Sequence, residues 1–215
     1  LEIKHDVFRK IEKYRKKSSI VTSNTSTIPR AQLIEGMPSS FGKDFFITHF
    51  FNPPRYLRLL EVVASKEVDN RKLDAIIDFC DVRLGKEVVV CNDTPGFIGN
   101  RIGMFWSLTA MVEAFKAGLT VEEADAIMGR PIGAPKTGVF ALVDVVGLDL
   151  IPHVTESLSH NLSDDDKYNE GVKEQSELGI DSLLKEMVES GYTGRKGKGG
   201  FYRINSNNGN RVKES

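Results

Sequence analysis

A histidine and a glutamate lie twelve residues apart in two apolar segments of the chain. His49 falls within the run Phe45–Phe51, and Glu61 follows the apolar run that begins at Leu57. A histidine in such a strand can act as a general acid or base, and a carboxylate can orient its ring. If the two strands are neighbours, the pair could take the proton of a substrate hydroxyl. The alternative is a strand histidine with satisfied hydrogen bonds beside a solvated glutamate.

Two further polar side chains lie where a ligand could meet them. Ser26 belongs to the polar cluster Ser23–Thr27, which follows a short predicted strand. Ligands of open α/β sheets bind at the carboxyl ends of strands. Asn100 lies one helical turn after Gly96, at the start of a long predicted helix. Without further information, Ser26 could equally cap a helix, and Asn100 could occupy an exposed helix face.

These segments occur in an order that is typical of one enzyme family. The chain reads Ser-Asn-Thr-Ser at 23–26, His-Phe-Phe-Asn-Pro at 49–53 and Asp-Thr-Pro-Gly-Phe-Ile-Gly-Asn-Arg at 93–101. It thereby resembles the 3-hydroxyacyl-CoA dehydrogenase family from Lys4 to about Tyr202, nearly the whole chain. That family oxidises (S)-3-hydroxyacyl-CoA to 3-ketoacyl-CoA with NAD. The resemblance therefore implies an acyl-CoA substrate and NAD as cofactor.

The resemblance also implies a role for each of these polar residues. His49 would be the base and Glu61 its partner. Ser26 and Asn100 would contact the substrate, and Ser26 would also lie close to the nicotinamide. A non-catalytic relative that keeps the fold as an assembly module is the alternative of another class. The presence of all four residues argues against it.

Three more residues are carried over as cofactor contacts. Asn52 follows the histidine segment, Lys4 matches a lysine near the NAD ribose, and Lys196 matches a C-terminal lysine that approaches NAD. The family pattern around Lys196 is Lys-Thr-Gly-x-Gly-Phe-Tyr, and here Gly197 and Lys198 replace the threonine and the first glycine. The alternatives are an Asn-Pro turn, a solvated helix face and an ordinary basic turn.

The sequence contains no strand–Gly-x-Gly-x-x-Gly–helix unit, whose helix N-terminus holds the pyrophosphate of a dinucleotide. The glycines of Gly194–Gly200 are not this motif, because they lead into Phe201-Tyr202 rather than into a helix. We therefore expect Leu1 to correspond to a point inside the NAD-binding domain. We also expect the 215-residue chain by itself to be nearly inactive.

The periodicity predicts an α/β part followed by an all-α part. The resemblance implies that the first, residues 1–93, is the C-terminal part of a Rossmann-type NAD-binding domain, and that the second, 94–215, is a helical domain for dimerisation and substrate binding. Thr27 is the predicted N-cap of a short helix. The predicted elements are helices over 5–17 and 70–84, strands over 19–22, 45–51, 57–63 and 87–91, and later helices over 97–117, 121–128, 140–144, 148–159 and 171–190.

Composition narrows the class of protein. A net charge of −1 with 27% charged residues argues against a nucleic-acid partner, and no apolar run reaches the length of a membrane span. Cys80 and Cys91 form neither a disulfide framework nor a metal-ligand spacing. They suit the cytoplasm, or the mitochondrion or peroxisome of a eukaryote. No metal is expected.

Two partner expectations follow from the resemblance and from composition. The apolar helices after Asp93 favour a homodimer. The stretches Asn52–Leu57 and Val143–Asp149 look closest to the family members that are joined to an enoyl-CoA hydratase, which implies a role in fatty-acid β-oxidation. A short-chain 3-hydroxybutyryl-CoA dehydrogenase is the alternative within the family.

Overall fold

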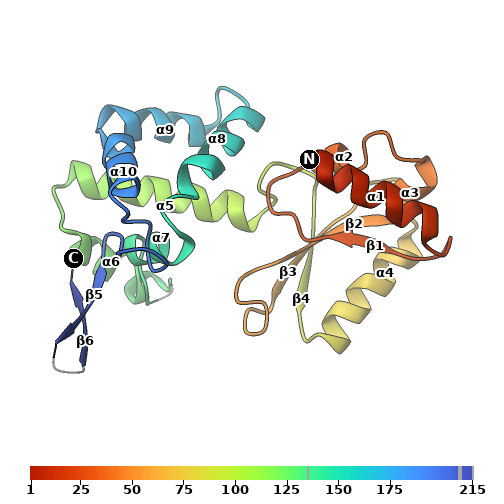
Figure 1. Cartoon of the computed structure of the whole chain (residues 1–215), viewed down its shortest axis with the longest axis horizontal. Coiled ribbons are helices and arrows are strands. Elements are labelled where there is room, and N and C mark those ends of the chain that lie inside the picture. Colours follow the sequence, from red (N-terminus) through yellow and green to blue (C-terminus); the bar gives the residue numbers. More distant parts are fainter. Residues whose placement is uncertain (135, 208–209, 215) are drawn as a thin grey trace. The chain divides into compact units, whose positions relative to one another are not determined.

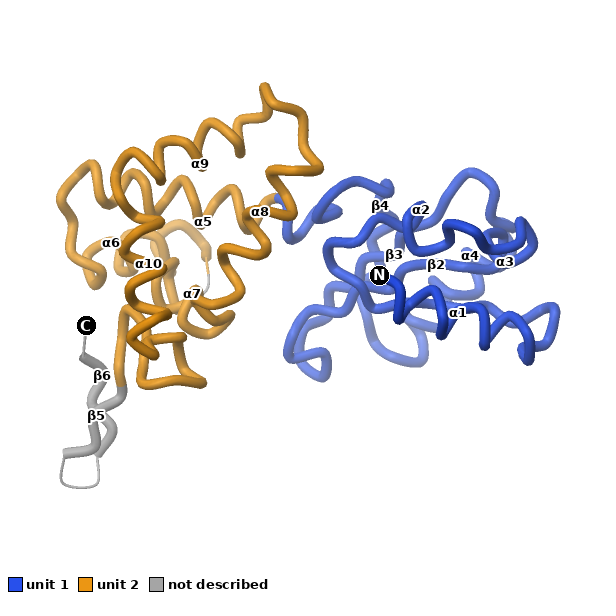
Figure 2. The backbone as a smooth tube through the Cα atoms, turned by 45° about the horizontal axis from the view of Figure 1, so that its top comes forward, with its two compact units in different colours: residues 1–101 blue, residues 102–215 orange. Residues whose placement is uncertain are grey.

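The computed structural model describes residues 1–134, 136–207 and 210–214. The chain forms two compact units, Leu1–Arg101 and Ile102–Ser215 (Figure 2). Helix α5, Gly99–Lys116, begins in the first unit and continues into the second. Its first residues therefore belong with the sheet of the first unit.

The first unit is a sheet between two helical layers. The strand order is β1 (Val21–Ser23), β2 (Phe45–Phe50), β3 (Leu59–Val63), β4 (Glu87–Cys91). The outer pairs are parallel, whereas β2 and β3 are antiparallel. Helices lie on both sides of it, as Figure 1 shows: α1 (Glu2–Tyr14), α2 (Arg30–Leu33) and α3 (Ser39–Asp44) on one face, and α4 (Asn70–Asp78) on the other. This is the predicted Rossmann-type architecture.

Alternation along β2 divides the apolar side chains between the two faces. Phe45 and Ile47 pack with Phe8 and Phe41 under α1–α3, and Phe8 meets Phe45 edge to face with ring centroids 5.1 Å apart. The next residue in the strand, Phe46, joins the core under α4. The same period places the side chain of residue 49 on the Phe45 face.

The helix predicted over 5–17 is shorter at its end. Helix α1 ends at Tyr14 because Arg15 adopts an extended conformation, with φ −68° and ψ 153°. The guanidinium of Arg15 donates to the Asp44 carboxylate at 2.7 Å and to the Ser19 carbonyl at 3.0 Å. Burial alone would raise the pKa of Asp44, but its bonds with Lys72 and Arg15 lower that pKa.

The segment predicted as one helix over 70–84 is α4 followed by a π-helical turn, Phe79–Arg83.

The predicted N-cap of the short helix is wrong. Pro29 occupies the N-cap position of α2, and Thr27 lies outside the helix. The free amides of Arg30 and Ala31 donate instead to the Asp93 carboxylate, at 2.6 and 2.9 Å. The capping group comes from more than sixty residues along the chain, so local sequence could not indicate it.

The second unit is helical, with a C-terminal hairpin of β5 (Arg203–Asn207) and β6 (Asn210–Glu214) that the helical prediction omitted. The segment predicted as one helix over 171–190 is two helices, because Gly179 lies between them in the left-handed region with φ +73°. The remaining elements are α6 (Val121–Ile127), the 3₁₀ turn Arg130–Ile132, α7 (Phe140–Val146), α8 (Ile151–Asn161), α9 (Lys167–Glu177) and α10 (Ile180–Glu189).

Two buried aspartates organise the backbone of this unit. Asp125 accepts the amides of Val139 and Phe140, both at 2.7 Å, at the start of α7. Asp144, on α7, accepts the amides of Phe201 and Tyr202, both at 2.8 Å, and so fixes the segment after the glycine-rich loop. Among the residues described, none of the helices has the length and apolar character that crossing a membrane requires.

Candidate active site

The two residues of the predicted acid/base pair face each other across the centre of the sheet. His49 on β2 is directly opposite Glu61 on β3 in the antiparallel register. Their side chains lie on the same face, with Nδ1 of His49 2.6 Å from Oε2 of Glu61. Only 6% of His49 and 1% of Glu61 is exposed. The two side chains are therefore in hydrogen-bonding contact within the sheet.

The second carboxylate oxygen of Glu61 binds the start of helix α5. Its Oε1 accepts the backbone amides of Ile98 at 2.9 Å and Gly99 at 2.7 Å. Burial alone would raise the pKa of Glu61, but the bonds from His49 and from these two amides outweigh it and lower the pKa. The N-terminus of a helix stabilises a nearby anion, which also lowers the pKa of a carboxyl group there. Glu61 is therefore held as a carboxylate.

This arrangement determines which nitrogen of His49 is free to act. An ionised carboxylate has no proton to donate, so Glu61 must accept from His49 as it does from the two amides. The Nδ1 of His49 then carries a proton and donates it to Glu61. In the neutral ring Nε2 keeps its lone pair and can accept a proton from a substrate.

The thiol of Cys91 is also close to Glu61. Burial together with that carboxylate raises the pKa of Cys91 to about 11.

Aromatic side chains enclose the histidine. The ring of Phe51 lies 4.5 Å from the His49 ring, centroid to centroid, and that of Phe97 lies 5.8 Å away. Phe97 is buried with φ +49°, a conformation that a residue with a side chain adopts rarely and at a cost in strain. Together with Gly96, at φ +72°, it turns the chain so that the first amides of α5 meet Glu61. A Cβ on Gly99 would press against the Phe51 ring.

The structure brings Ser26 and Asn100 together. Nδ2 of Asn100 lies 3.5 Å from the backbone carbonyl oxygen of Ser26, and both residues are half-buried in the first unit. Asn24 accepts the amide of Phe50 at 2.9 Å, which ties the 23–27 turn to the end of β2. The turn therefore lies beside the strand that carries His49.

The predicted cofactor residues other than Ser26 belong to different elements. Lys4 is half-buried on α1, and Asn52 is exposed in the loop after β2. Lys196 belongs to the second unit, where its ammonium donates to Asp149 at 2.8 Å. Within the described parts of the chain, no group of three or more His, Cys, Asp or Glu side chains could hold a metal ion.

Sequence reasoning missed the residues that hold Glu61 from behind. The donors at Ile98 and Gly99 are backbone amides, which leave no signature in side-chain type. The one available signal was the Thr94-Pro95-Gly96 turn immediately before a predicted helix, since a turn there leaves free amides.

Two family models match the chain. Residues 1–94 match the model of the 3-hydroxyacyl-CoA dehydrogenase NAD binding domain, and residues 96–204 match that of the 3-hydroxyacyl-CoA dehydrogenase C-terminal domain. The chain belongs to the 3-hydroxyacyl-CoA dehydrogenase family. Members of this family are NAD-dependent oxidoreductases.

Three relatives illustrate the range of similarity within the 3-hydroxyacyl-CoA dehydrogenase family. A putative fatty acid oxidation complex trifunctional enzyme of Rickettsia prowazekii is 38% identical over all of this chain, which spans 29% of that relative. A probable 3-hydroxybutyryl-CoA dehydrogenase of Deinococcus radiodurans is 33% identical over 94% of this chain and 67% of its own. The crystal structure of (S)-3-hydroxybutyryl-CoA dehydrogenase from Ralstonia eutropha is 27% identical with a TM-score of 0.78, over 94% of this chain and 66% of that one.

The position of Glu61 predicts a pH-dependent stability. Because its pKa is lowered in the folded state, its contribution is present above the ordinary pKa of 4.5 and is lost as the pH falls through the folded-state value. We expect Glu61→Gln to be less stable than the wild type near pH 7, and the difference to shrink on acidification below about pH 4. Urea unfolding at a series of pH values measures this. The exposed Glu35→Gln serves as control, and a difference that is constant with pH would contradict the assignment.

Proposed function

We propose that the chain carries the proton-transfer site of a dehydrogenase that oxidises (S)-3-hydroxyacyl-CoA to 3-ketoacyl-CoA. The observation that carries this proposal is the buried His49–Glu61 pair, in which Glu61 is held as an anion by two amides of α5. Membership of the 3-hydroxyacyl-CoA dehydrogenase family supplies the reaction class.

Oxidation of a secondary alcohol removes a hydride and a proton. The acceptor for the hydride would be supplied by bound NAD. His49 takes the hydroxyl proton at Nε2, while its Nδ1–H remains on Glu61. The imidazolium formed in this step is stabilised by the adjacent carboxylate, whose negative charge the two backbone amides maintain. Ser26 and Asn100 offer a hydroxyl and an amide to hold the substrate oxygen, and their contact in the structure supports a common role.

The chain supplies part of what holds the cofactor. Ser26 lies in the turn at the carboxyl end of β1, where ligands of open α/β sheets bind, and Asn52 presents an exposed amide after β2. Lys4 and Lys196 are proposed contacts on the ground of family resemblance. The 215 residues contain no Gly-x-Gly-x-x-Gly turn to cradle a pyrophosphate. We therefore propose that this chain by itself binds NAD weakly and has little activity.

The proposed pathway is fatty-acid β-oxidation. Support comes from the relatives that are named as trifunctional enzymes of fatty acid oxidation, of whose length the chain spans 29%. An enoyl-CoA hydratase, fused or associated, is accordingly the proposed partner. The 3-hydroxybutyryl-CoA dehydrogenases among the relatives favour a short-chain substrate as the second candidate.

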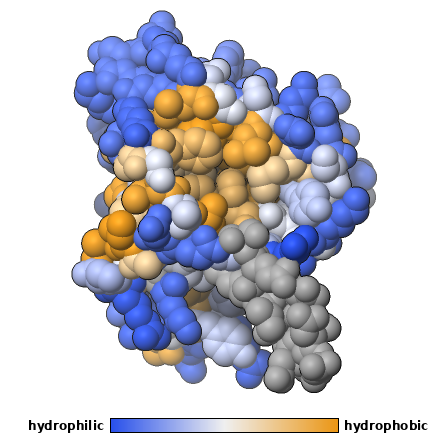
Figure 3. All heavy atoms as spheres, turned by 90° about the vertical axis from the view of Figure 1, so that its left-hand side faces the viewer, coloured by the Kyte–Doolittle hydropathy of each residue, from blue (hydrophilic) through white to orange (hydrophobic). Residues whose placement is uncertain are grey.

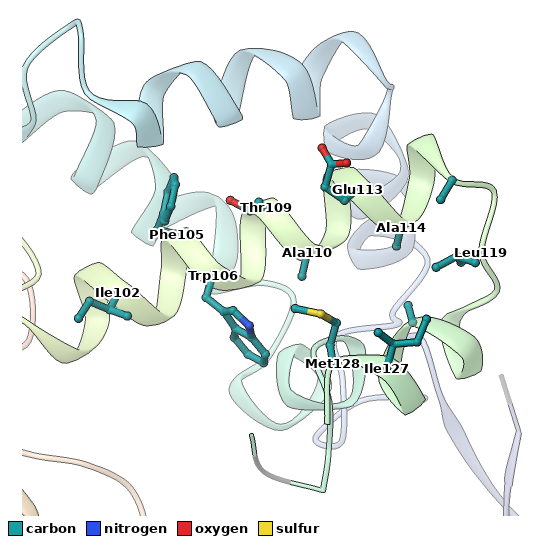
Figure 4. Close-up of a pocket in the computed structure, with 12 residues that line it drawn as sticks. Ile102, Phe105, Trp106, Thr109, Ala110, Glu113, Ala114, Leu119, Ile127 and Met128 are labelled. Carbon is teal, nitrogen blue, oxygen red and sulfur yellow. The ribbon is translucent and has the colours of Figure 1, made fainter. Parts of the chain in front are cut away.

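We further propose that the second unit pairs with another copy. Its surface carries a gathering of apolar side chains (Figure 3). A groove of about 520 Å³ runs between α5 and α6, and in Figure 4 the side chains of Trp106 and Met128 point into it. Ile102, Phe105 and Ile127 in its lining are 63%, 38% and 51% exposed. Exposed apolar surface of this kind is typical of protein interfaces.

The first prediction concerns the base. In a chain that carries the complete NAD-binding domain, His49→Gln should lower turnover by about 10²–10⁴-fold, the usual contribution of a general base, with a smaller change in KM. Steady-state oxidation of 3-hydroxybutyryl-CoA and of a long-chain substrate would measure this and compare the two candidate substrates. His160→Gln, an exposed histidine of the second unit, is the control. Unimpaired turnover in His49→Gln would refute the role.

The second prediction concerns the cofactor. Calorimetric titration of the 215-residue chain with NAD should give no binding as tight as that of a complete dehydrogenase, because the pyrophosphate cradle is not among its residues. Fusion of a strand–Gly-x-Gly-x-x-Gly–helix unit to its N-terminus should give tighter binding. If the 215-residue chain binds NAD equally tightly, the Gly-rich turn is not needed for the cofactor and this proposal is wrong.

The third prediction concerns self-association. In sedimentation velocity the chain should form a dimer, and Ile102→Asp should shift it towards the monomer because a carboxylate would be desolvated in the groove. Ile132→Asp is the matched control, since Ile132 is 54% exposed in the same unit and does not line the groove. A monomer at the highest concentration tolerated, or equal effects of both substitutions, would count against the groove as the interface.

A further inference from the structure

Lys86 is a lysine whose side chain is buried rather than solvated. It lies just before β4 and is 6% exposed. Its ammonium donates to the backbone carbonyls of Pro54 and Leu57, the latter at 2.7 Å, and lies 5.8 Å from the centroid of the Phe50 ring. Lysine is rarely buried to this extent, because removing an ammonium from water is costly unless its donors are satisfied. A burial of this kind needs an explanation.

Both carbonyls belong to one loop, residues 51–58, which joins β2 to β3. Asn52 and all residues from there to Leu59 are exposed, so side-chain packing contributes little to the order of this loop. Within the loop, the amides of Tyr56 and Leu57 donate to the Pro53 carbonyl at 3.0 and 3.1 Å. Lys86 adds two charge-assisted bonds from outside it, and such bonds are stronger than neutral ones.

The loop begins at the candidate active site. Phe51, its first residue, lies against the His49 ring at 4.5 Å and close to Gly99. Asn52 comes next and is the proposed cofactor contact. The Lys86 ammonium also lies over the ring of Phe50, the residue between His49 and Phe51. Lys86 therefore contacts the chain on both sides of Phe51, at Phe50 and in the loop. The order of the loop and the position of the Phe51 ring are thus linked through the backbone.

We propose that Lys86 is a positioning residue, whose ammonium clamps the 51–58 loop. The clamp holds Phe51 over His49, and it holds Asn52 at the cofactor side of the site. The significance of the clamp for catalysis rests on the proposed function. The clamp itself does not, because it can be measured without turnover.

The test compares Lys86→Met, which removes the charge and the donors, with Lys86→Arg, which keeps both. Lys43→Met, an exposed lysine of α3, is the matched control. Hydrogen exchange of the full 215-residue chain should be faster by about tenfold or more at the amides of Tyr56 and Leu57 in Lys86→Met, since loss of the clamp favours local opening. The amides that pair β2 with β3 should be unchanged. Lys86→Arg should restore most of the protection.

A second measurement reports on His49 itself. Diethylpyrocarbonate should modify His49 several-fold faster in Lys86→Met, because release of Phe51 uncovers the ring. His153 and His160, in the second unit, are internal controls whose rates should not change. If Lys86 merely stabilised the fold, Lys86→Met would accelerate exchange in β2 and β3 as well as in the loop. Lys86→Arg would then not selectively restore the slow modification of His49.

The outcomes separate the clamp from the proposed function. Unchanged exchange in the loop, or uniform acceleration across the sheet, overturns the clamp. If Lys86→Met does not fold, Lys86→Gln takes its place, and failure of both to fold overturns it too, since a loop clamp leaves the core intact. Selective opening with no change at His49 shows that Lys86 does not position Phe51. Unimpaired turnover in His49→Gln would refute the proposed function but not the clamp.

Discussion

The candidate site depends on one carboxylate that is bound on both of its oxygens. Glu61 joins β3 to His49 on β2 through one oxygen and to the start of α5 through the other. Without the contact to Glu61, the His49 ring would be free to rotate. Without the two amides of α5, the carboxyl of Glu61 would be free to take up a proton. Both together make the negative charge the lowest-energy state of a group that is 1% exposed. The orientation of His49 follows from this arrangement.

Sequence reasoning predicted the parts of the site that depend on side-chain type and strand order. The β-type run around His49 and the apolar run before Glu61 are predicted as two consecutive strands, and the observed register places the two residues opposite each other. The Rossmann-type half and the helical half were also recovered. Boundaries were less accurate where a tertiary contact decides them, as at Tyr14, where Arg15 leaves the helix to bind Asp44.

What sequence reasoning could not predict is the set of side chains that bind a distant backbone. Asp93 caps α2 from across the unit, the amides of Ile98 and Gly99 bind Glu61, and Lys86 binds the carbonyls of the 51–58 loop. Each contact joins residues that are dozens of positions apart. Residue type indicates that a carboxylate or an ammonium needs partners, but only the fold shows which backbone groups are available.

These contacts share a physical logic. The segments around His49 are loops and helix ends, which leave amides and carbonyls unpaired by secondary structure. A charged side chain in a strand or next to one pairs such groups with bonds stronger than neutral ones, and the sheet holds that side chain in place. The start of α2 and the 51–58 loop are held beside the sheet in this way. Asn52 and Ser26 lie in two of these segments, after β2 and after β1, so both side chains stay outside the apolar core of the sheet.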